Sequence, residues 1–357
     1  MRLTRAGHVG VKEALPWARC GLLVSLAMTS LPAHLLGQGA VHLLLRAQAS
    51  LESLRDPGAI VDAAEDVRGN IFMLDARSRV TVLDQHLRLL GTFGNQPGGP
   101  MAFRDPISIG VFRDGRVAVL DQARQAITVL RPELGGRQLV PTDTLELSFF
   151  GRAMCVLRDN TFLIYGASHG MRVHVLSRSG RLLRSFAPAD PTLDPKVQAQ
   201  FTMGRVGCDQ ERDEIVLTSG FLPVVEAYRI STGQRIWADT LRPYRPAEIS
   251  IRGSGMSIVT WRAGHSVPVT ALVLDNCRLL QARYLARRDR ATVDTVVSYV
   301  FRDTSHTGPA VQRDIPLLVP LGGSKVLSVP AAQSVIQLQD VSVDGCRVGA
   351  ASRATRR

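Results

Sequence analysis

The sequence predicts an all-β fold, a six-bladed β-propeller, and three observations lead to that prediction. Apolar, strand-like segments separated by polar turns recur along the 357 residues, and helical periodicity is absent almost everywhere. Six hairpin patterns can be counted, each followed by a third strand-like segment. The repeat length lies near that of a four-stranded propeller blade.

The six hairpins define the expected blades. In residues 107–121 the turn Asp114-Gly115 separates two β-rich segments, which is the strongest short hairpin signal a sequence gives. Residues 154–165 repeat the pattern with Asp159-Asn160 at the turn. With four further hairpins, the blades are expected to start near residues 60, 107, 153, 206, 249 and 317.

Each third strand is followed by a tight turn and an arginine, which we expect on the solvated outer rim. These residues are Arg88, Arg137, Arg181, Arg235, Arg278 and Arg347. The interval before Arg347 is long, but it is too short for two blades. Residues 286–314 are therefore predicted to be an insertion within or after blade five, of the kind that forms a functional loop or cap.

A closed ring needs a strand to complete its last blade, because an open sheet edge would pair with other chains. The apolar segment 40–48 precedes blade one and has no partner of its own. It is predicted to add the outer strand to blade six. The propeller would then occupy residues 40–350, followed by a disordered tail at 351–357.

The N-terminal region has the layout of a secretory signal peptide. Basic residues precede the apolar run Gly21–Met28, and the small residues Gly37 and Gly39 follow it. A membrane anchor is the alternative, but the run is far short of the ~20 residues that span a bilayer, and Pro32 interrupts its continuation. We expect residues 1–39 to be removed and the protein to be exported to the periplasm or the extracellular space.

The formal net charge of +12 is carried almost wholly by arginine, and the arginines are scattered instead of forming runs. No aromatic-basic motif or helix-turn-helix pattern accompanies them, so nucleic acid is not an expected partner. Anionic surfaces or ligands are compatible with the charge. The processed chain is expected to be a monomer without a membrane span.

The segment from Gly91 to Leu130 combines a Gly-rich linker, Phe103-x-x-Pro106, the Asp-Gly hairpin and an aspartate, Asp121, that closes the second strand. Blade one shares Gly69-Asn70 and Asp75. These features resemble the NHL-repeat propellers, and the resemblance implies the fold over residues 55–350. Blades three to six keep only the strand and turn rhythm, so a family-level function is hardly implied.

The candidate ligand-binding residues are Arg77, Arg124, His169 and His265, each predicted in a loop that follows a second strand. Such loops project on one face of a propeller and would favour an anionic or polar ligand. Solvated loop positions in an Arg-rich chain are the plainer interpretation. Asp75 and Asp121 are interpreted as turn caps, and His174 as a polar residue of a sheet surface.

Four cysteines follow the signal region, and an exported protein permits disulfides. Cys155 and Cys208 are predicted in the first strands of consecutive blades, close to the axis, and are the expected pair. Cys277 and Cys346 are predicted in outer turns, where blades diverge, and are not expected to pair.

Two functions remain open from the sequence. The leading hypothesis is a non-enzymatic, exported binding protein that engages a protein, peptide or glycan through the loop face and residues 286–314, with no cofactor. The alternative is a lyase or hydrolase with a divalent metal in the central channel, for which His169 and His265 are the candidate ligands. Relatives of the resembled propellers include such enzymes, but metal-ligand spacing is absent here.

Overall fold

The computed structural model describes residues 40–55, 57–94, 103–190, 198, 204–220, 222–241, 248–252, 256–260, 265–274, 277–288, 291–302, 310–313, 315–330 and 334–346. For 248–252, 256–260, 265–269, 283–288, 291–295, 302 and 310 it describes the backbone only. The predicted signal peptide (1–39) and C-terminal tail (351–357) lie outside the described residues.

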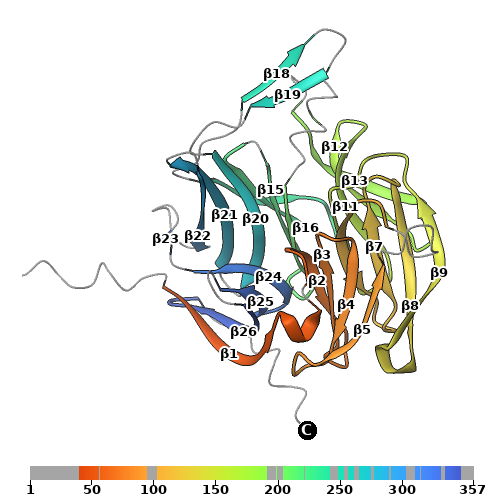
Figure 1. Ribbon diagram of the computed structural model, residues 1–357. Helices are drawn as coiled ribbons and strands as arrows, with labels where there is room; N and C mark the ends of the chain where they lie inside the picture. The colour runs from red at the N-terminus through yellow and green to blue at the C-terminus, as the bar shows by residue number, and fades with distance from the viewer. Residues whose placement is uncertain are drawn as a thin grey trace, which may run out of the picture. The chain divides into compact units, whose positions relative to one another are not determined.

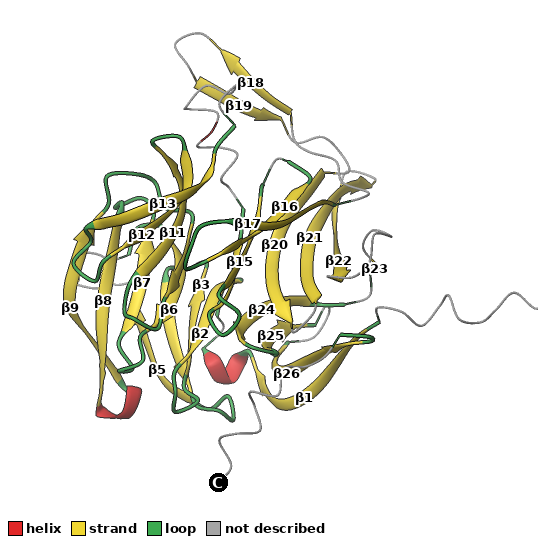
Figure 2. Cartoon of the chain, turned by 180° about the vertical axis from the view of Figure 1, so that it is seen from behind, coloured by secondary structure: helices red, strands yellow, loops and turns green. Residues whose placement is uncertain are grey.

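Within the described residues of the unit from Gly37 to Arg357, six four-stranded antiparallel sheets form the blades of the propeller (Figures 1 and 2). Blades one to three comprise β2 (Ile60–Glu65), β3 (Ile71–Asp75), β4 (Arg79–Leu83) and β5 (Leu89–Gly94); β6 (Pro106–Val111), β7 (Val117–Asp121), β8 (Ala126–Glu133) and β9 (Gln138–Glu146); and β10 (Ala153–Val156), β11 (Phe162–Ser168), β12 (Met171–Leu176) and β13 (Leu182–Pro188).

Blades four to six comprise β14 (Val206–Asp209), β15 (Glu214–Thr218), β16 (Val224–Arg229) and β17 (Arg235–Thr240); β20 (His265–Leu274), β21 (Cys277–Arg288), β22 (Ala291–Arg302) and β23 (Ala310–Gln312); and β24 (Leu317–Gly322), β25 (Lys325–Val329), β26 (Val335–Val343) and β1 (Val41–Ser50). In the described part of the chain, two short 3-10 helices, η2 (Glu52–Leu54) and η3 (Leu134–Gly136), lie in connections.

The innermost strands form a closed ring. Each touches the next in the order β2, β6, β10, β14, β20 and β24, and β24 returns to β2. Strand β1 pairs antiparallel with β26, from Val41 opposite Val343 to Ser50 opposite Val335. The predicted six-bladed, four-stranded architecture and its closure by an N-terminal strand are therefore confirmed.

Apolar side chains fill the spaces between neighbouring blades. The second strands β3 and β7 are buried at every position, because each is covered on both faces by adjoining sheets. One core cluster joins Phe72 and Leu74 of blade one to Val117 and Val119 of blade two. At the hairpin turns, Gly115 (φ 84°) and Asn160 (φ 64°) adopt the left-handed conformation that these residue types favour.

Blade five differs from the prediction. Strands β18 (Glu248–Arg252) and β19 (Met256–Thr260), which come between β17 and β20 in the sequence, pair with each other in a separate two-stranded sheet. The blade begins at His265 instead of residue 249, and residues 286–314, predicted as an insertion, include most of its outer strands. A strand-turn-strand pattern does not distinguish a blade hairpin from a separate one, which explains the error.

Candidate functional site

The innermost strands of all six blades line a cavity of about 640 Å³ along the axis of the ring. We call its two ends the loop face and the hairpin face. The loop face carries the starts of the innermost strands and the turns between second and third strands. The hairpin face carries the turns between first and second strands and between third and fourth strands.

The cations at the hairpin-face end are neutralised by neighbouring carboxylates. Lys325 Nζ lies 2.7 Å from Glu65 Oε1, and Arg158 Nη2 lies 2.8 Å from Glu211 Oε1. Arg212 pairs with Asp209 in the same way. All six residues except Lys325 line the cavity, so this end presents matched charges.

Two arginines near the loop face are placed differently. Arg205 precedes β14 and lines the cavity. Arg152 precedes β10 and is attracted to Asp105, which precedes β6 of blade two. Within the described residues, neither guanidinium makes a hydrogen bond or ion pair, and the Nε of Arg152 is buried without a partner. Burial lowers the pKa of Arg152, and attraction to Asp105 partly offsets that effect.

Asp62, near the start of β2, is one of the acidic residues that line the cavity. Its Oδ2 accepts hydrogen bonds from Ser108 Oγ (2.7 Å) and from the backbone N–H of Ile109 (2.9 Å). Burial raises the pKa of Asp62 above 3.8, although these bonds and the charge of Arg205 act in the opposite direction. Ser108 also accepts from the N–H of Met154 (3.2 Å), so the contacts continue into blade three.

Three of the four predicted ligand-binding residues lie on the loop face. Arg77, Arg124 and His169 are exposed in the turns that follow the second strands of blades one, two and three. His169 has φ 50°, and its Nδ1 lies 2.8 Å from Ser168 Oγ. His265 is instead the first residue of β20, the innermost strand of blade five, because the blade starts later than predicted.

The interpretation of Asp75 and Asp121 as turn caps agrees with the structure. Asp75 Oδ1 accepts the backbone N–H groups of Arg77 (2.8 Å) and Arg79 (3.1 Å). Asp121 accepts those of Arg104 (2.7 Å) and Asp105 (3.1 Å) at the start of its own blade. Both carboxylates are fully buried and hold the turns that carry Arg77 and Arg124.

His174 also has a structural role. It is buried, with Nδ1 2.8 Å from Ser185 Oγ and Nε2 2.9 Å from the carbonyl of Gly166. Burial lowers its pKa. Among the described residues no group of three His, Cys, Asp or Glu side chains could hold a metal ion. The metal hypothesis for His169 and His265 stays a prediction, because the His265 side chain lies outside the described atoms.

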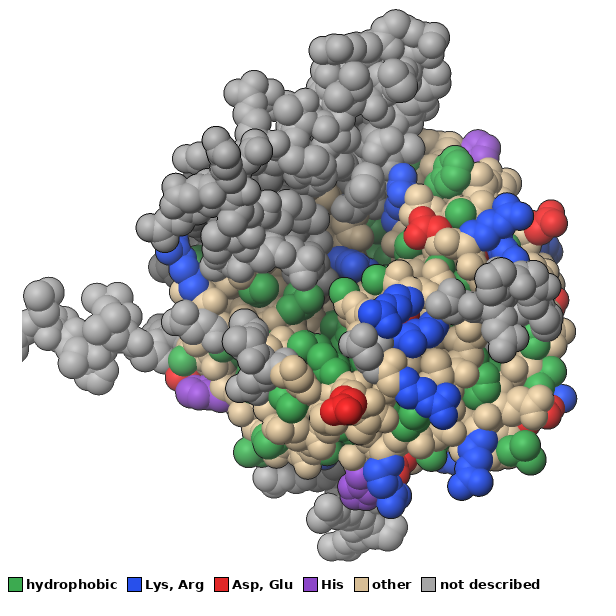
Figure 3. Space-filling view, viewed as in Figure 1, with side chains coloured by type: hydrophobic (Ala, Val, Ile, Leu, Met, Phe, Trp, Pro, Cys, Tyr) green, Lys and Arg blue, Asp and Glu red, His purple; other side chains and the backbone are tan. Residues whose placement is uncertain are grey.

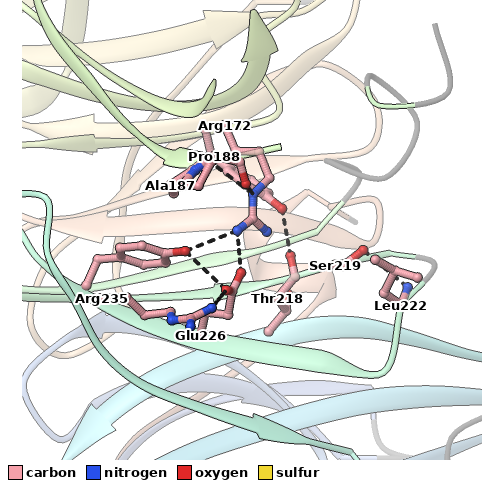
Figure 4. A network of polar contacts seen from close by, with 10 residues as sticks. Arg172, Ala187, Pro188, Thr218, Ser219, Leu222, Glu226 and Arg235 are labelled. Atoms are coloured by element: carbon pink, nitrogen blue, oxygen red, sulfur yellow. Dashed lines mark hydrogen bonds and ion pairs between the residues drawn. The ribbon is translucent and has the colours of Figure 1, made fainter. Parts of the chain in front are cut away.

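Polar contacts join the third strands of blades three and four (Figure 4). Arg172 of β12 binds Glu226 of β16 and donates to Tyr228 Oη at 3.2 Å, while Arg235 Nη1 donates to Glu226 at 3.2 Å. Burial favours protonated Glu226, but the two guanidinium groups outweigh it and lower its pKa. Burial also raises the pKa of Tyr228 to about 12.

Two disulfides are present. Cys155–Cys208 joins the innermost strands of blades three and four, as predicted, with Cα atoms 6.6 Å apart. Cys277–Cys346, which was not expected, joins blades five and six with Cα atoms 5.8 Å apart. The prediction failed because Cys277 lies in the first hairpin of blade five, not in an outer turn. Arg278 beside it is buried against Glu214 (2.6 Å) instead of lying on the rim.

Comparisons with known proteins identify the architecture only. No protein-family model and no curated protein matches the sequence, so the NHL-repeat resemblance stays a prediction. A protein described as exported, from Bacteroides fragilis, has a similar structure, with a TM-score of 0.56 and 10% identity, covering 85% of this chain and 95% of the other. A DUF4221 family member from Bacteroides vulgatus has a TM-score of 0.53 and 7% identity, covering 86% and 99%.

One further property concerns membranes. No helix within the described part of the chain is long and apolar enough to cross a bilayer.

Proposed function

We propose that the protein is an exported binding protein that engages an anionic protein, peptide or glycan through the loop face of its propeller. The observation that carries the proposal is the exposure of Arg77, Arg124 and His169 on the same face of three consecutive blades. Charged groups gathered around one opening raise the local concentration of oppositely charged ligands. Figure 3 shows many Lys and Arg side chains, and fewer Asp and Glu, over the described surface of the face it presents.

Export is supported by three features. The N-terminal region has the layout of a signal peptide. Two disulfides suit an oxidising compartment, where they form and persist. One protein of similar fold is described as exported. Expression of the tagged full-length chain in a bacterium should give protein outside the cytosol with an N-terminus near Ala40, whereas an intact N-terminus in the cytosol would contradict export.

The binding proposal is tested with heparin and poly-glutamate columns as anionic glycan and peptide probes. The Arg77→Glu, Arg124→Glu double variant should elute at clearly lower salt than the native protein, because the reversed charges repel the probe and salt screens the attraction. The control is Arg113→Glu with Arg178→Glu, two exposed arginines in turns of the hairpin face. It makes the same change in net charge.

The two double variants decide whether the loop face matters. If they elute together, binding follows net charge and the loop face is not the binding surface. If only the loop-face variant elutes early, the column that shows the larger difference identifies the preferred ligand class. Matching unfolding temperatures for the two variants would confirm that both are folded.

A further inference from the structure

Two residues of opposite charge line the central cavity from opposite blades. Asp62 lies near the start of β2 in blade one, and Arg205 immediately precedes β14 in blade four. The innermost strands follow one another around the ring in the order β2, β6, β10, β14, β20 and β24. Blades one and four are therefore three steps apart in either direction, so the anion and the cation belong to opposite walls.

Neighbouring contacts show how each side chain leaves its strand. Asp62 Oδ2 accepts a hydrogen bond from Ser108 Oγ (2.7 Å), so the carboxylate points toward blade two. A Cβ on Gly207 would lie 2.5 Å from the carbonyl oxygen of Ala271 in blade five. Side chains two residues apart in a strand face the same side, so Arg205 is on the side of blade five. Each charged group thus leaves its strand on the side of the next blade around the ring.

The backbone of Arg205 is fixed by blade four. Its N–H donates to Thr218 Oγ1 (2.8 Å), and its carbonyl accepts the N–H of Thr218 (3.0 Å). A Cβ on the preceding residue, Gly204, would lie 1.7 Å from the carbonyl oxygen of Thr218, so only glycine permits this approach. The fold therefore determines where the arginine side chain begins.

The two charges interact without bonding to each other. The positive charge of Arg205 reaches the carboxylate of Asp62 and opposes the rise in its pKa. The side chains nevertheless form no hydrogen bond or ion pair with each other. They are close enough to attract through space but too far apart for direct contact, which leaves a gap between a cation and an anion.

Both groups have unused bonding capacity. The guanidinium of Arg205 carries five N–H donors and makes no hydrogen bond within the described residues. Asp62 accepts from Ser108, Ile109 and Ala63, all of them uncharged donors. A carboxylate can accept about four hydrogen bonds, so one position remains for a further donor. Neither charge has an oppositely charged group in contact with it.

We propose that Asp62 and Arg205 form a site in the central cavity for a small zwitterion, an amino acid or a short peptide, whose carboxylate binds Arg205 and whose ammonium group binds Asp62. A planar guanidinium binds a carboxylate through paired hydrogen bonds. The cavity volume of about 640 Å³ lies in the range of small-molecule sites. The site goes beyond the proposed function, because its ligand lies inside the cavity and contacts different residues.

The first test is isothermal titration calorimetry of the intact mature protein with alanine and with alanyl-alanine at low ionic strength. Saturable binding of at least one is expected, and the tighter ligand distinguishes an amino acid from a short peptide. Its N-acetyl form keeps only the carboxylate, and its C-terminal amide form keeps only the ammonium group. Each blocked form should bind at least about tenfold more weakly, because one charge-assisted bond is lost.

Two variants assign the two ends of the ligand. Arg205→Gln should weaken the zwitterion at least about tenfold but should not weaken the amide form, which has no carboxylate. Asp62→Asn should weaken the zwitterion but not the N-acetyl form, which has no ammonium group. The control Arg113→Gln, an exposed position of the hairpin face, should leave binding of the zwitterion within about twofold.

Three outcomes would overturn the site: no saturable binding of either zwitterion to the native protein, equal binding of the zwitterion and one of its blocked forms, or unchanged binding to Arg205→Gln. The comparison of ligands on the native protein stands even if a variant does not fold. Failure of the proposed function is a separate result. It would show as unchanged column elution of Arg77→Glu with Arg124→Glu, whether or not the zwitterions bind.

Discussion

Two junctions of the ring are each bridged by a carboxylate, and the carboxylates have opposite pKa shifts. Between blades one and two, Asp62 accepts hydrogen bonds from an uncharged hydroxyl and an uncharged amide. Between blades three and four, Glu226 is bound by the guanidinium groups of Arg172 and Arg235. Burial opposes ionisation at both, yet the pKa is raised for Asp62 and lowered for Glu226.

The difference shows that neutral donors do not offset desolvation of a carboxylate, whereas two adjacent cations do. It also separates the roles of the junctions. The junction of blades three and four is held by ionic contacts and a disulfide. The junction of blades one and two has no such reinforcement within the described residues.

The largest effect is expected from removing the disulfide at the reinforced junction. Cys155→Ala with Cys208→Ala should lower the free energy of unfolding by about 4 kcal/mol, because a loop of 53 residues is no longer closed in the unfolded chain. Urea unfolding measures this loss. Since Cys277–Cys346 closes 69 residues, its removal serves as a matched control with a similar loss. An unchanged urea midpoint in the first variant would show that the ionic contacts alone hold blades three and four together.

The next effect concerns the ionic contacts. Glu226→Ala should lower the free energy of unfolding by about 3 kcal/mol, because it leaves the largely buried Arg172 without its carboxylate partner. Asp62→Ala should cost less, about 1 kcal/mol, since its lost partners are neutral and the cavity admits water. Equal losses in urea unfolding would contradict the distinction between an ionic and a neutral junction.

The smallest effect is a pH dependence with opposite signs at the two sites. Glu226 stabilises the fold above its ordinary pKa of 4.5, and this stabilisation is lost as the pH falls through its lowered folded pKa. Glu226→Gln should therefore lose more stability, relative to the native protein, at pH 7 than at pH 3.

For Asp62 the sign is reversed. The pKa of Asp62 in the folded protein is raised above 3.8. Its contribution to the stability of the fold is therefore complete below pH 3.8 and is lost as the pH rises through the folded pKa. The free energy of unfolding of Asp62→Asn, relative to that of the native protein, should consequently be higher at pH 7 than at pH 3. Urea unfolding at both pH values gives the two differences, and slopes of the same sign would show that the partners do not govern the pKa shifts.

Most of the fold could be predicted from the sequence, but little of the candidate site could. Hairpin turns such as Asp114-Gly115 mark local structure, and repetition converts them into blades, so the ring and its closing strand could be predicted. The same reasoning gave the wrong assignment for residues 249–261, because a hairpin pattern does not indicate whether the hairpin pairs with a neighbouring strand. As a result, Cys277, Arg278 and His265 were predicted in the wrong parts of blade five.

The cavity-lining Arg205 was missed for a different reason. It is one of many scattered arginines, and the sequence around it gives no sign that it faces the central cavity. Asp62 carried no signal, because its contacts with Ser108 and Ile109 join different blades and depend on the assembled ring.

The closing strand makes the timing of folding depend on both ends of the propeller sequence. Val41 is among the first residues of the propeller to be synthesised, and its partner Val343 is among the last. β1 must therefore wait, with its backbone groups unpaired, until blade six has been made, and such distant pairing folds slowly. A nascent chain halted before residue 335 lacks β26, so it would expose β1 to other chains during translation. Holding the chain unfolded until it is complete would protect it from that risk.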